Sequence, residues 1–151
     1  MMATPVRVLG LGNELLGDDA FGILVAHEIQ RLAPDLVDVV CTPESGFSLL
    51  DYILGAPRLL VVDAIQTGRA EPGTLHEIAE GDLESAPGGS PHFVGLFETL
   101  ELARKLGLPA PSDVRILAVE AADCLTVGGP MHPAVTDAIP EAVRRIQSLI
   151  R

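Results

Sequence analysis

Three residues in this chain have types and positions that suit metal binding: Asp19, Asp63 and His92. Each Asp lies where an apolar segment gives way to a turn, and His92 lies in a Pro-His turn before a predicted helix. Two carboxylates and one imidazole bind a first-row divalent metal and leave coordination positions open for a substrate. The simpler interpretation makes the two Asp residues helix caps and His92 an ordinary loop residue.

The turn that carries Asp19 belongs to the segment 9–22, which holds several glycines and two adjacent carboxylates. Gly12 lets the backbone adopt conformations closed to other residues, or lets a ligand approach closely. Asp18 and Asp19 suit the cap of the helix that follows. A dinucleotide fingerprint needs another glycine three residues after Gly12, where this chain has Leu15, and the two negative charges would repel a pyrophosphate. The turn therefore favours a cation over a phosphate.

Other polar residues lie on predicted strand-end loops, and Glu44, Glu120 and Asp123 are candidates to line the same cleft. His76 alternates with apolar neighbours, which predicts a side chain that faces solvent. His132 precedes a proline that begins a helix, which predicts a cap or surface residue. Neither a Gly-x-Ser-x-Gly nucleophile elbow nor a His-Glu-x-x-His zinc helix occurs in the sequence.

Alternating strands and helices must position these residues. Apolar runs predict strands at 6–11, 37–41, 58–63, 74–79 and 114–119. Helical spacing of apolar residues predicts helices at 19–32, 47–54, 93–106 and 133–150, the last with a kink at Pro140. This order indicates one α/β domain over residues 1–151: a doubly wound, mostly parallel open sheet with helices on both faces and one possible antiparallel edge strand. Asp19 and Asp63 then share the carboxyl edge of the sheet, where ligands usually bind.

The composition indicates a globular protein with a sizeable core. The chain has 151 residues, of which 48% are hydrophobic, and its mean hydropathy is +0.36. Only 3% of the residues are aromatic, and the formal net charge is −11. These values argue against nucleic acid or an anionic membrane as a partner, and they favour a cation or a basic protein surface.

Cysteine usage and the N-terminus indicate the compartment. Cys41 and Cys124 are too few for a disulfide framework, and we expect each to be a small buried residue. Residues 1–5 lack the basic start of a signal peptide, and no apolar run reaches the roughly 20 residues of a membrane span. We therefore expect a cytoplasmic protein. We also expect a monomer, although the sequence does not determine the oligomeric state.

Residues 10–22 resemble, almost throughout, the opening motif of the hydrogenase maturation endopeptidases. Residues 61–65 are similar to the second motif of that family, and Pro91-His92 is similar to the third. The order of helices and strands agrees from residue 6 to the last helix, so the resemblance covers nearly the whole chain. The metal ligands of the family correspond here to Asp19, Asp63 and His92.

The resemblance implies an endopeptidase that removes a short C-terminal extension from the large-subunit precursor of a nickel–iron hydrogenase after nickel insertion. It implies that Asp19, Asp63 and His92 coordinate nickel carried by the precursor, and that the protein has no metal of its own. The nickel then acts as a specificity check, or as a Lewis acid at the scissile peptide. Alternatively, Asp19 and Asp63 form an aspartic-type pair that activates water.

Gly12, Asn13 and Glu44 are the expected substrate contacts. Glu44 belongs to the segment 41–44, Cys-Thr-Pro-Glu, which replaces the Asp-Gly-Gly-Thr of many family members. The Pro-Glu pair resembles the variant in members that serve soluble, cofactor-reducing hydrogenases, so the identity of the substrate hydrogenase stays open. Because a fold does not fix function, a non-catalytic metal-binding or docking module of hydrogenase assembly is the alternative function.

Overall fold

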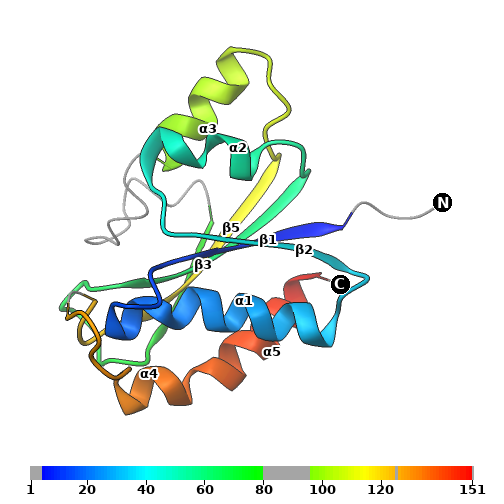
Figure 1. The fold of residues 1–151 in the computed structure, drawn as a ribbon. Coiled ribbons are helices and arrows are strands. Elements are labelled where there is room, and N and C mark those ends of the chain that lie inside the picture. The colour runs from blue at the N-terminus through cyan, green and yellow to red at the C-terminus, as the bar shows by residue number, and fades with distance from the viewer. Residues whose placement is uncertain (1–4, 80–95, 125, 151) are drawn as a thin grey trace.

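A five-stranded sheet forms the middle layer of the molecule, and helices cover both of its faces (Figure 1). The structure is a computed structural model that describes residues 5–79, 96–124 and 126–150. The strand order is β2-β1-β3-β5-β4, with β4 antiparallel to β5 at one edge and the other pairs parallel. This arrangement confirms the predicted fold class, including its antiparallel edge strand.

The strands form close to where the apolar runs predict them. Their bounds are β1 Val6–Leu11, β2 Val37–Thr42, β3 Arg58–Ile65, β4 Leu75–Ala79 and β5 Asp113–Glu120. β3 is buried along almost its whole length because helices cover it on both sides, whereas β4 at the edge is only half-buried. The predicted end of β3 was wrong: the strand continues to Ile65, so Asp63 lies inside it and pairs in register with Ala118.

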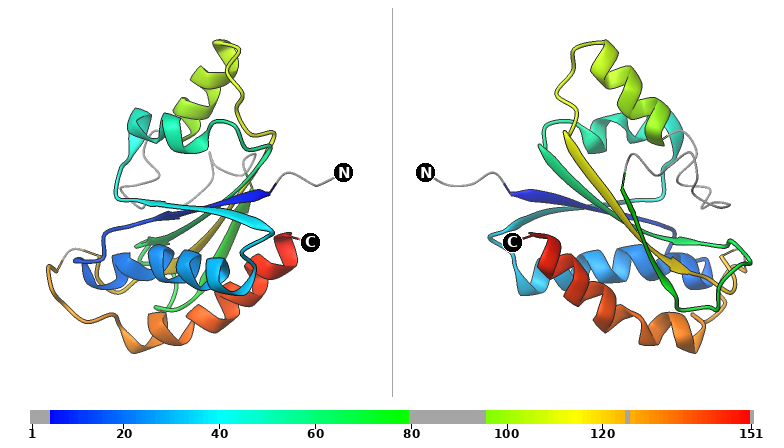
Figure 2. Two further views of the ribbon diagram at one scale, coloured as in Figure 1. Left: turned by 45° about the vertical axis from the view of Figure 1, so that its right-hand side comes forward. Right: turned by 180° about the vertical axis from the view of Figure 1, so that it is seen from behind.

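The helices form two layers (Figures 1 and 2). The layer on one face contains α1 Phe21–Leu32, α4 Pro133–Asp137 and α5 Ile139–Ile150, and the layer on the other contains the 3-10 helix η2 Gly46–Leu49, α2 Leu50–Ile53 and α3 Leu96–Lys105. A second 3-10 helix, η1 Gly17–Ala20, leads into α1. Within the described residues, no helix has the length and apolar character needed to cross a membrane.

Two predicted helices differ from the structure. The helix predicted at 19–32 begins as the 3-10 helix η1 and becomes α-helical only at Phe21. The helix predicted at 133–150 is divided into α4 and α5 just before Pro140, because a proline has no N–H to donate to the carbonyl four residues back. The start of the helix predicted at 93–106 lies outside the described residues.

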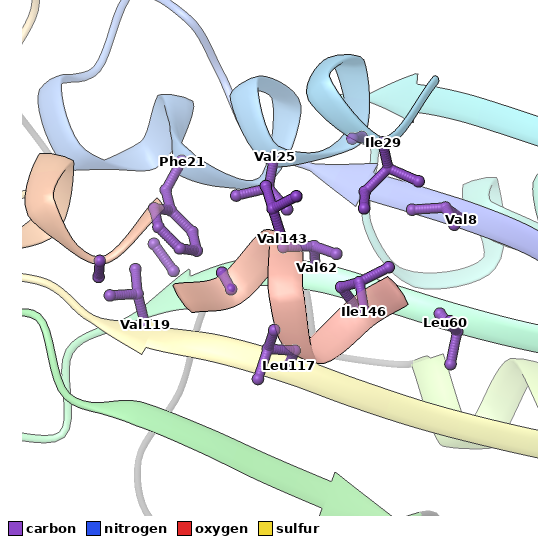
Figure 3. Packing of buried hydrophobic residues seen from close by; sticks show 14 of the residues in the cluster. Val8, Phe21, Val25, Ile29, Leu60, Val62, Leu117, Val119, Val143 and Ile146 are labelled. Atoms are coloured by element: carbon purple, nitrogen blue, oxygen red, sulfur yellow. The ribbon is translucent and has the colours of Figure 1, made fainter. Parts of the chain in front are cut away.

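Side chains of β3 point alternately into two apolar clusters, one on each face of the sheet. Val62 belongs to the cluster under α1 and α5, and Val61 belongs to the cluster under α2 and α3. Figure 3 shows the first cluster, to which α1 and α5 contribute Phe21, Val25, Ile29, Val143 and Ile146. Asp63 has the same phase as Val61, so its side chain stands on the α2 and α3 face.

The chain reverses its winding between β1 and β3. The connection from β1 to β2 runs through α1 on one face, and the connection from β2 to β3 runs through α2 on the other (Figure 1). In open α/β sheets, ligands bind outside the carboxyl ends of the strands at such a point. Asp19 follows β1 and Asp63 lies near the end of β3, so the topology brings both to this position.

Candidate functional site

The turn after β1 lies unusually close to the end of β3. Gly12 has a φ of +154°, and a Cβ at this position would lie 2.0 Å from the carbonyl oxygen of Asp19. A Cβ at Gly22 would lie 2.4 Å from the carbonyl oxygen of Val62. Only glycine permits these approaches: the first folds the turn back onto Asp19, and the second brings the start of α1 against β3. η1 also contacts β3.

Asp19 is a buried side chain of this turn, with 2% of its surface exposed. Its Oδ2 accepts a hydrogen bond from the backbone N–H of Asn13 at 3.0 Å. The prediction that Asp19 caps a helix was wrong, because Leu16 is the N-cap residue of η1 and Ala20 is that of α1. Asn13 also accepts the N–H of Leu15 through its own Oδ1, at 2.9 Å. The carboxylate of Asp19 therefore helps to shape the loop that surrounds it.

Asp18 joins the turn after β1 to the loop after β5. It is 1% exposed, and its carboxylate accepts three backbone N–H groups, from Ala122 at 2.7 Å, Asp123 at 2.9 Å and His132 at 2.7 Å. The predicted role as a helix cap was therefore wrong for Asp18 as well. Three charge-assisted hydrogen bonds offset the cost of burying this carboxylate and fix one loop against the other.

Asp63 is fully buried near the end of β3, where its Oδ1 accepts the N–H of Ala64 at 2.7 Å. Gln66, which follows the strand, connects this region to the loop after β5. Its Nε2 donates to the carbonyl oxygen of Ala122 at 2.9 Å, and its Oε1 accepts the N–H of Cys124 at 3.4 Å. Ala122 therefore binds Asp18 through its N–H and Gln66 through its carbonyl, so one short segment holds both loops that flank the candidate site.

Glu120, at the end of β5, holds the loop after β3. It is 1% exposed and accepts bonds from the N–H and hydroxyl of Thr67 at 2.9 and 2.5 Å, and from the N–H of Gly68 at 3.3 Å. His76 Nε2 lies 3.2 Å from the same carboxylate, so the prediction that His76 faces solvent was wrong. Burial alone would raise the pKa of Glu120, but the hydrogen bonds from Thr67, His76 and Gly68 together lower it.

Negative charge is concentrated around one buried thiol at this edge of the sheet. Burial is the main cause that raises the pKa of Cys124 to about 12, and the negative charges of Asp19, Asp18, Asp63 and Asp123 raise it further. Cys124 is the small buried residue that the sequence predicts, whereas Cys41 is only half-buried. The carboxylates thus create a negative potential that attracts a cation, which fits the chemistry expected from the residue types.

The remaining predicted residues lie at different distances from this centre. Gly12 and Asn13 form the turn beside Asp19, while Glu44 is exposed in the loop after β2. His132 caps α4 by accepting the N–H of Ala134 at 3.1 Å, as predicted. His92 lies outside the described residues, and within them no group of three His, Cys, Asp or Glu side chains is arranged to hold a metal ion.

Comparison with known sequences adds a family assignment to this geometry. The sequence profile described as "Hydrogenase maturation protease" matches residues 23–149. The hydrogenase expression/formation protein HupD of Bradyrhizobium diazoefficiens is 32% identical over 143 residues, which cover 91% of this chain and 73% of that protein.

Comparison with solved structures agrees. The hydrogenase maturating endopeptidase HybD from Escherichia coli matches with a TM-score of 0.84 and 26% identity, over 98% of this chain and 93% of that one. The [NiFe] hydrogenase maturation protease HybD from Thermococcus kodakarensis matches with a TM-score of 0.75 and 25% identity, over 98% of this chain and all of that one (100%).

Proposed function

The chain belongs to the hydrogenase maturation protease family and is a peptidase, and we propose that it removes the C-terminal extension of a nickel–iron hydrogenase large-subunit precursor after nickel insertion. The observation that carries this proposal is the pair of buried carboxylates, Asp19 and Asp63, where the sheet reverses its winding. Buried carboxylates are costly unless they are paired, hydrogen-bonded or bound to a cation. A cation delivered by the substrate suits such a site.

In this proposal the nickel belongs to the substrate, and Asp19, Asp63 and His92 complete its coordination. Carboxylate and imidazole groups suit a first-row divalent ion, and the negative potential around Cys124 favours its approach. Nickel held by these residues would act as a Lewis acid on the scissile carbonyl or on a water molecule next to it. Because the donor groups come from two partners, a precursor without nickel would not be held for cleavage. The protein then needs no metal of its own.

In the competing hypothesis, Asp19 and Asp63 form an aspartic-type pair that transfers protons. A carboxylate beside the scissile peptide takes a proton from the attacking water and returns it to the leaving amine. The short bond from the N–H of Ala64 fixes one oxygen of Asp63, and the N–H of Asn13 fixes one oxygen of Asp19. Both carboxylates are therefore held in place for a substrate that docks at this edge.

The test mixes the purified protein with a nickel-loaded large-subunit precursor and follows the mass of the precursor. We expect a single C-terminal loss that requires nickel. Asp19→Asn and Asp63→Asn should slow it by roughly 100-fold or more, the contribution expected of a positioned acid or base. Asp38→Asn is the matched control, because Asp38 is a half-exposed aspartate near the start of β2, at the end of the sheet away from the candidate site.

Binding measurements separate the two roles of the carboxylates. If Asp63→Asn abolishes cleavage but keeps nickel-dependent binding of the precursor, Asp63 acts on water or on the leaving group. If nickel-dependent binding is lost as well, Asp63 holds the nickel. A stable complex of the unmodified protein with a precursor whose mass never changes would contradict the proposal and favour a docking module.

A further inference from the structure

Two large apolar side chains protrude from the loops around the candidate site. Val127 is 74% exposed and Leu15 is 66% exposed, more than any other large apolar residue in the described part of the chain. Leu15 lies in the loop after β1 and Val127 lies in the loop after β5. Exposed apolar side chains that gather on a surface mark interaction sites.

The two loops that carry these residues are bound to each other next to both of them. The N–H of Gly128, next to Val127, donates to the carbonyl oxygen of Leu15 at 2.7 Å. Asn13 holds the N–H of Leu15, and Asp123 holds both the N–H and the hydroxyl of Thr126. Both apolar side chains are therefore presented on fixed backbone. We call this pair, Leu15 and Val127, the apolar rim.

The apolar rim lies beside Asp18 and Asp19, the two buried aspartates of η1. The N–H of Asp19 donates to the carbonyl oxygen of Leu16, the residue directly after Leu15, at 2.9 Å. Asp18 binds the N–H groups of Ala122 and Asp123 in the loop that carries Val127. The apolar rim is therefore carried by the same two loops that hold Asp18 and Asp19.

The loops at this edge also differ in charge from the rest of the molecule. Glu14, Glu44, Glu71 and Asp123 are exposed on them, and Arg69 is the only Arg or Lys in residues 12–20, 43–49, 66–74 and 121–132. A partner that covers this edge binds most tightly if it carries basic groups on either side of an apolar side chain.

From these contacts and charges, and resting on the proposed function, we infer that the apolar rim is a docking surface for the precursor. Its occupant is a segment of the precursor near the scissile peptide that carries an apolar side chain flanked by basic residues. The apolar side chain packs on Leu15 and Val127, and the basic groups face carboxylates such as Glu14. This contact supplies binding affinity outside the coordination of nickel.

The test measures the dissociation constant of the nickel-loaded precursor for the unmodified protein and for the double variant Leu15→Ser/Val127→Ser. Because both residues are exposed, we expect the variant to fold normally, as checked by circular dichroism and thermal unfolding. We expect binding to weaken tenfold or more, as for loss of two buried apolar contacts, and KM to rise with kcat changed less than about twofold. Leu106→Ser is the matched control, since Leu106 is 63% exposed but follows α3, and it should bind like the unmodified protein.

Charge supplies a second readout. Glu14→Lys should weaken binding further, and raised ionic strength should weaken binding of the unmodified protein, because both act on the attraction to basic groups. The inference is overturned if the double variant binds as tightly as the unmodified protein, or if Leu106→Ser has the same effect. If the unmodified protein binds through the rim but never cleaves, the proposed function fails and the docking surface stands. If it cleaves and the rim variants bind normally, only the docking surface fails. If it neither binds nor cleaves, both are overturned.

Discussion

The sheet holds its carboxylates differently at its amino edge, where the parallel strands begin, and at its carboxyl edge, where they end. At the amino edge, aspartates pair with arginines: Asp38 lies 2.8 Å from Arg7 Nε, and Asp113 lies 3.4 Å from Arg58 Nε. Both aspartates are partly exposed, at 48% and 42% of the side chain. Ion pairs in such positions contribute about 0–1 kcal/mol, because water screens the charges.

At the carboxyl edge, carboxylates are buried and bind backbone N–H groups in place of arginines. Asp18 accepts three such groups, and Glu120 accepts two together with the Thr67 hydroxyl. Hydrogen bonds from neutral donors leave the negative charge in place, whereas an arginine would cancel it. The carboxyl edge therefore keeps a negative potential, because backbone N–H groups satisfy its buried carboxylates without cancelling their charge.

Among substitutions that distinguish the two edges, Gly12→Ala should have the largest effect on the free energy of unfolding. The new Cβ would lie 2.0 Å from the carbonyl oxygen of Asp19, at a φ of +154°, so the backbone must move. We expect the free energy of unfolding to fall by about 3 kcal/mol or more, as for a core clash added to backbone strain. Urea denaturation, followed by far-ultraviolet circular dichroism, measures this change.

Gly55→Ala is the matched control for Gly12→Ala at the amino edge. Gly55 also has a positive φ, +91°, but a Cβ there meets no atom within 4 Å. Only the backbone cost of roughly 1–2 kcal/mol remains. Equal losses from the two variants would contradict the close approach of the turn to Asp19.

The second largest effect should come from Asp18→Ala. The substitution leaves the N–H groups of Ala122, Asp123 and His132 without their acceptor, and each such bond to a charged group contributes about 1.5–3 kcal/mol before water replaces part of it. We expect a net loss of about 2–3 kcal/mol in the free energy of unfolding, measured by urea denaturation. Hydrogen exchange should also show faster opening of residues 122–132. Unchanged exchange there would mean that Asp18 does not join the two loops.

Much of the carboxyl edge can be predicted from the sequence, because local patterns of residues determine it. The apolar runs and the glycines around Asp19 place a strand, a tight turn and a helix within a short segment. The alternating order then brings Asp63 to the same edge. The sequence does not reveal that Asp18 joins two loops while Asp19 lies at the candidate site, because the two residues are adjacent and of the same type. It depends on N–H groups 104 to 114 residues further along the chain.

The same limit explains the errors at β3 and His76. β3 runs on past Asp63 because β5 continues to pair with it as far as Glu120, which is a property of the neighbouring strand. The partner of His76 is Glu120, 44 residues away, and no local alternation reveals it. Whether Asp19, Asp63 and His92 meet as a ligand set also depends on long-range packing, so those roles remain predictions.

The third effect concerns pH, and it should appear in Glu120→Gln. The hydrogen bonds lower the pKa of Glu120 in the folded state, so its ionised form stabilises the fold above the unfolded pKa of about 4.5. This contribution is complete at neutral pH and is lost as the pH falls through the lowered pKa. We expect Glu120→Gln to cost about 1–2 kcal/mol at pH 7, and the difference from the unmodified protein to shrink below pH 4.5.

Thermal unfolding of both proteins between pH 7 and pH 3 measures this difference. Glu77→Gln is the control, because Glu77 lies on β4 beside His76 but its side chain is 54% exposed. A Glu120→Gln penalty that stays constant across the range would show that the carboxylate contributes through packing and not through its charge.

The smallest effect should come from Asp38→Asn at the amino edge. This substitution removes the charge that faces Arg7 but keeps the shape of the side chain. Arg7 keeps its bonds to the carbonyl oxygens of Tyr52 and Leu54, at 3.1 and 2.6 Å, so its guanidinium stays satisfied. We expect a loss of less than about 1 kcal/mol, which raised salt should reduce further. A loss as large as that of Asp18→Ala, measured by the same urea denaturation, would erase the difference between the two edges.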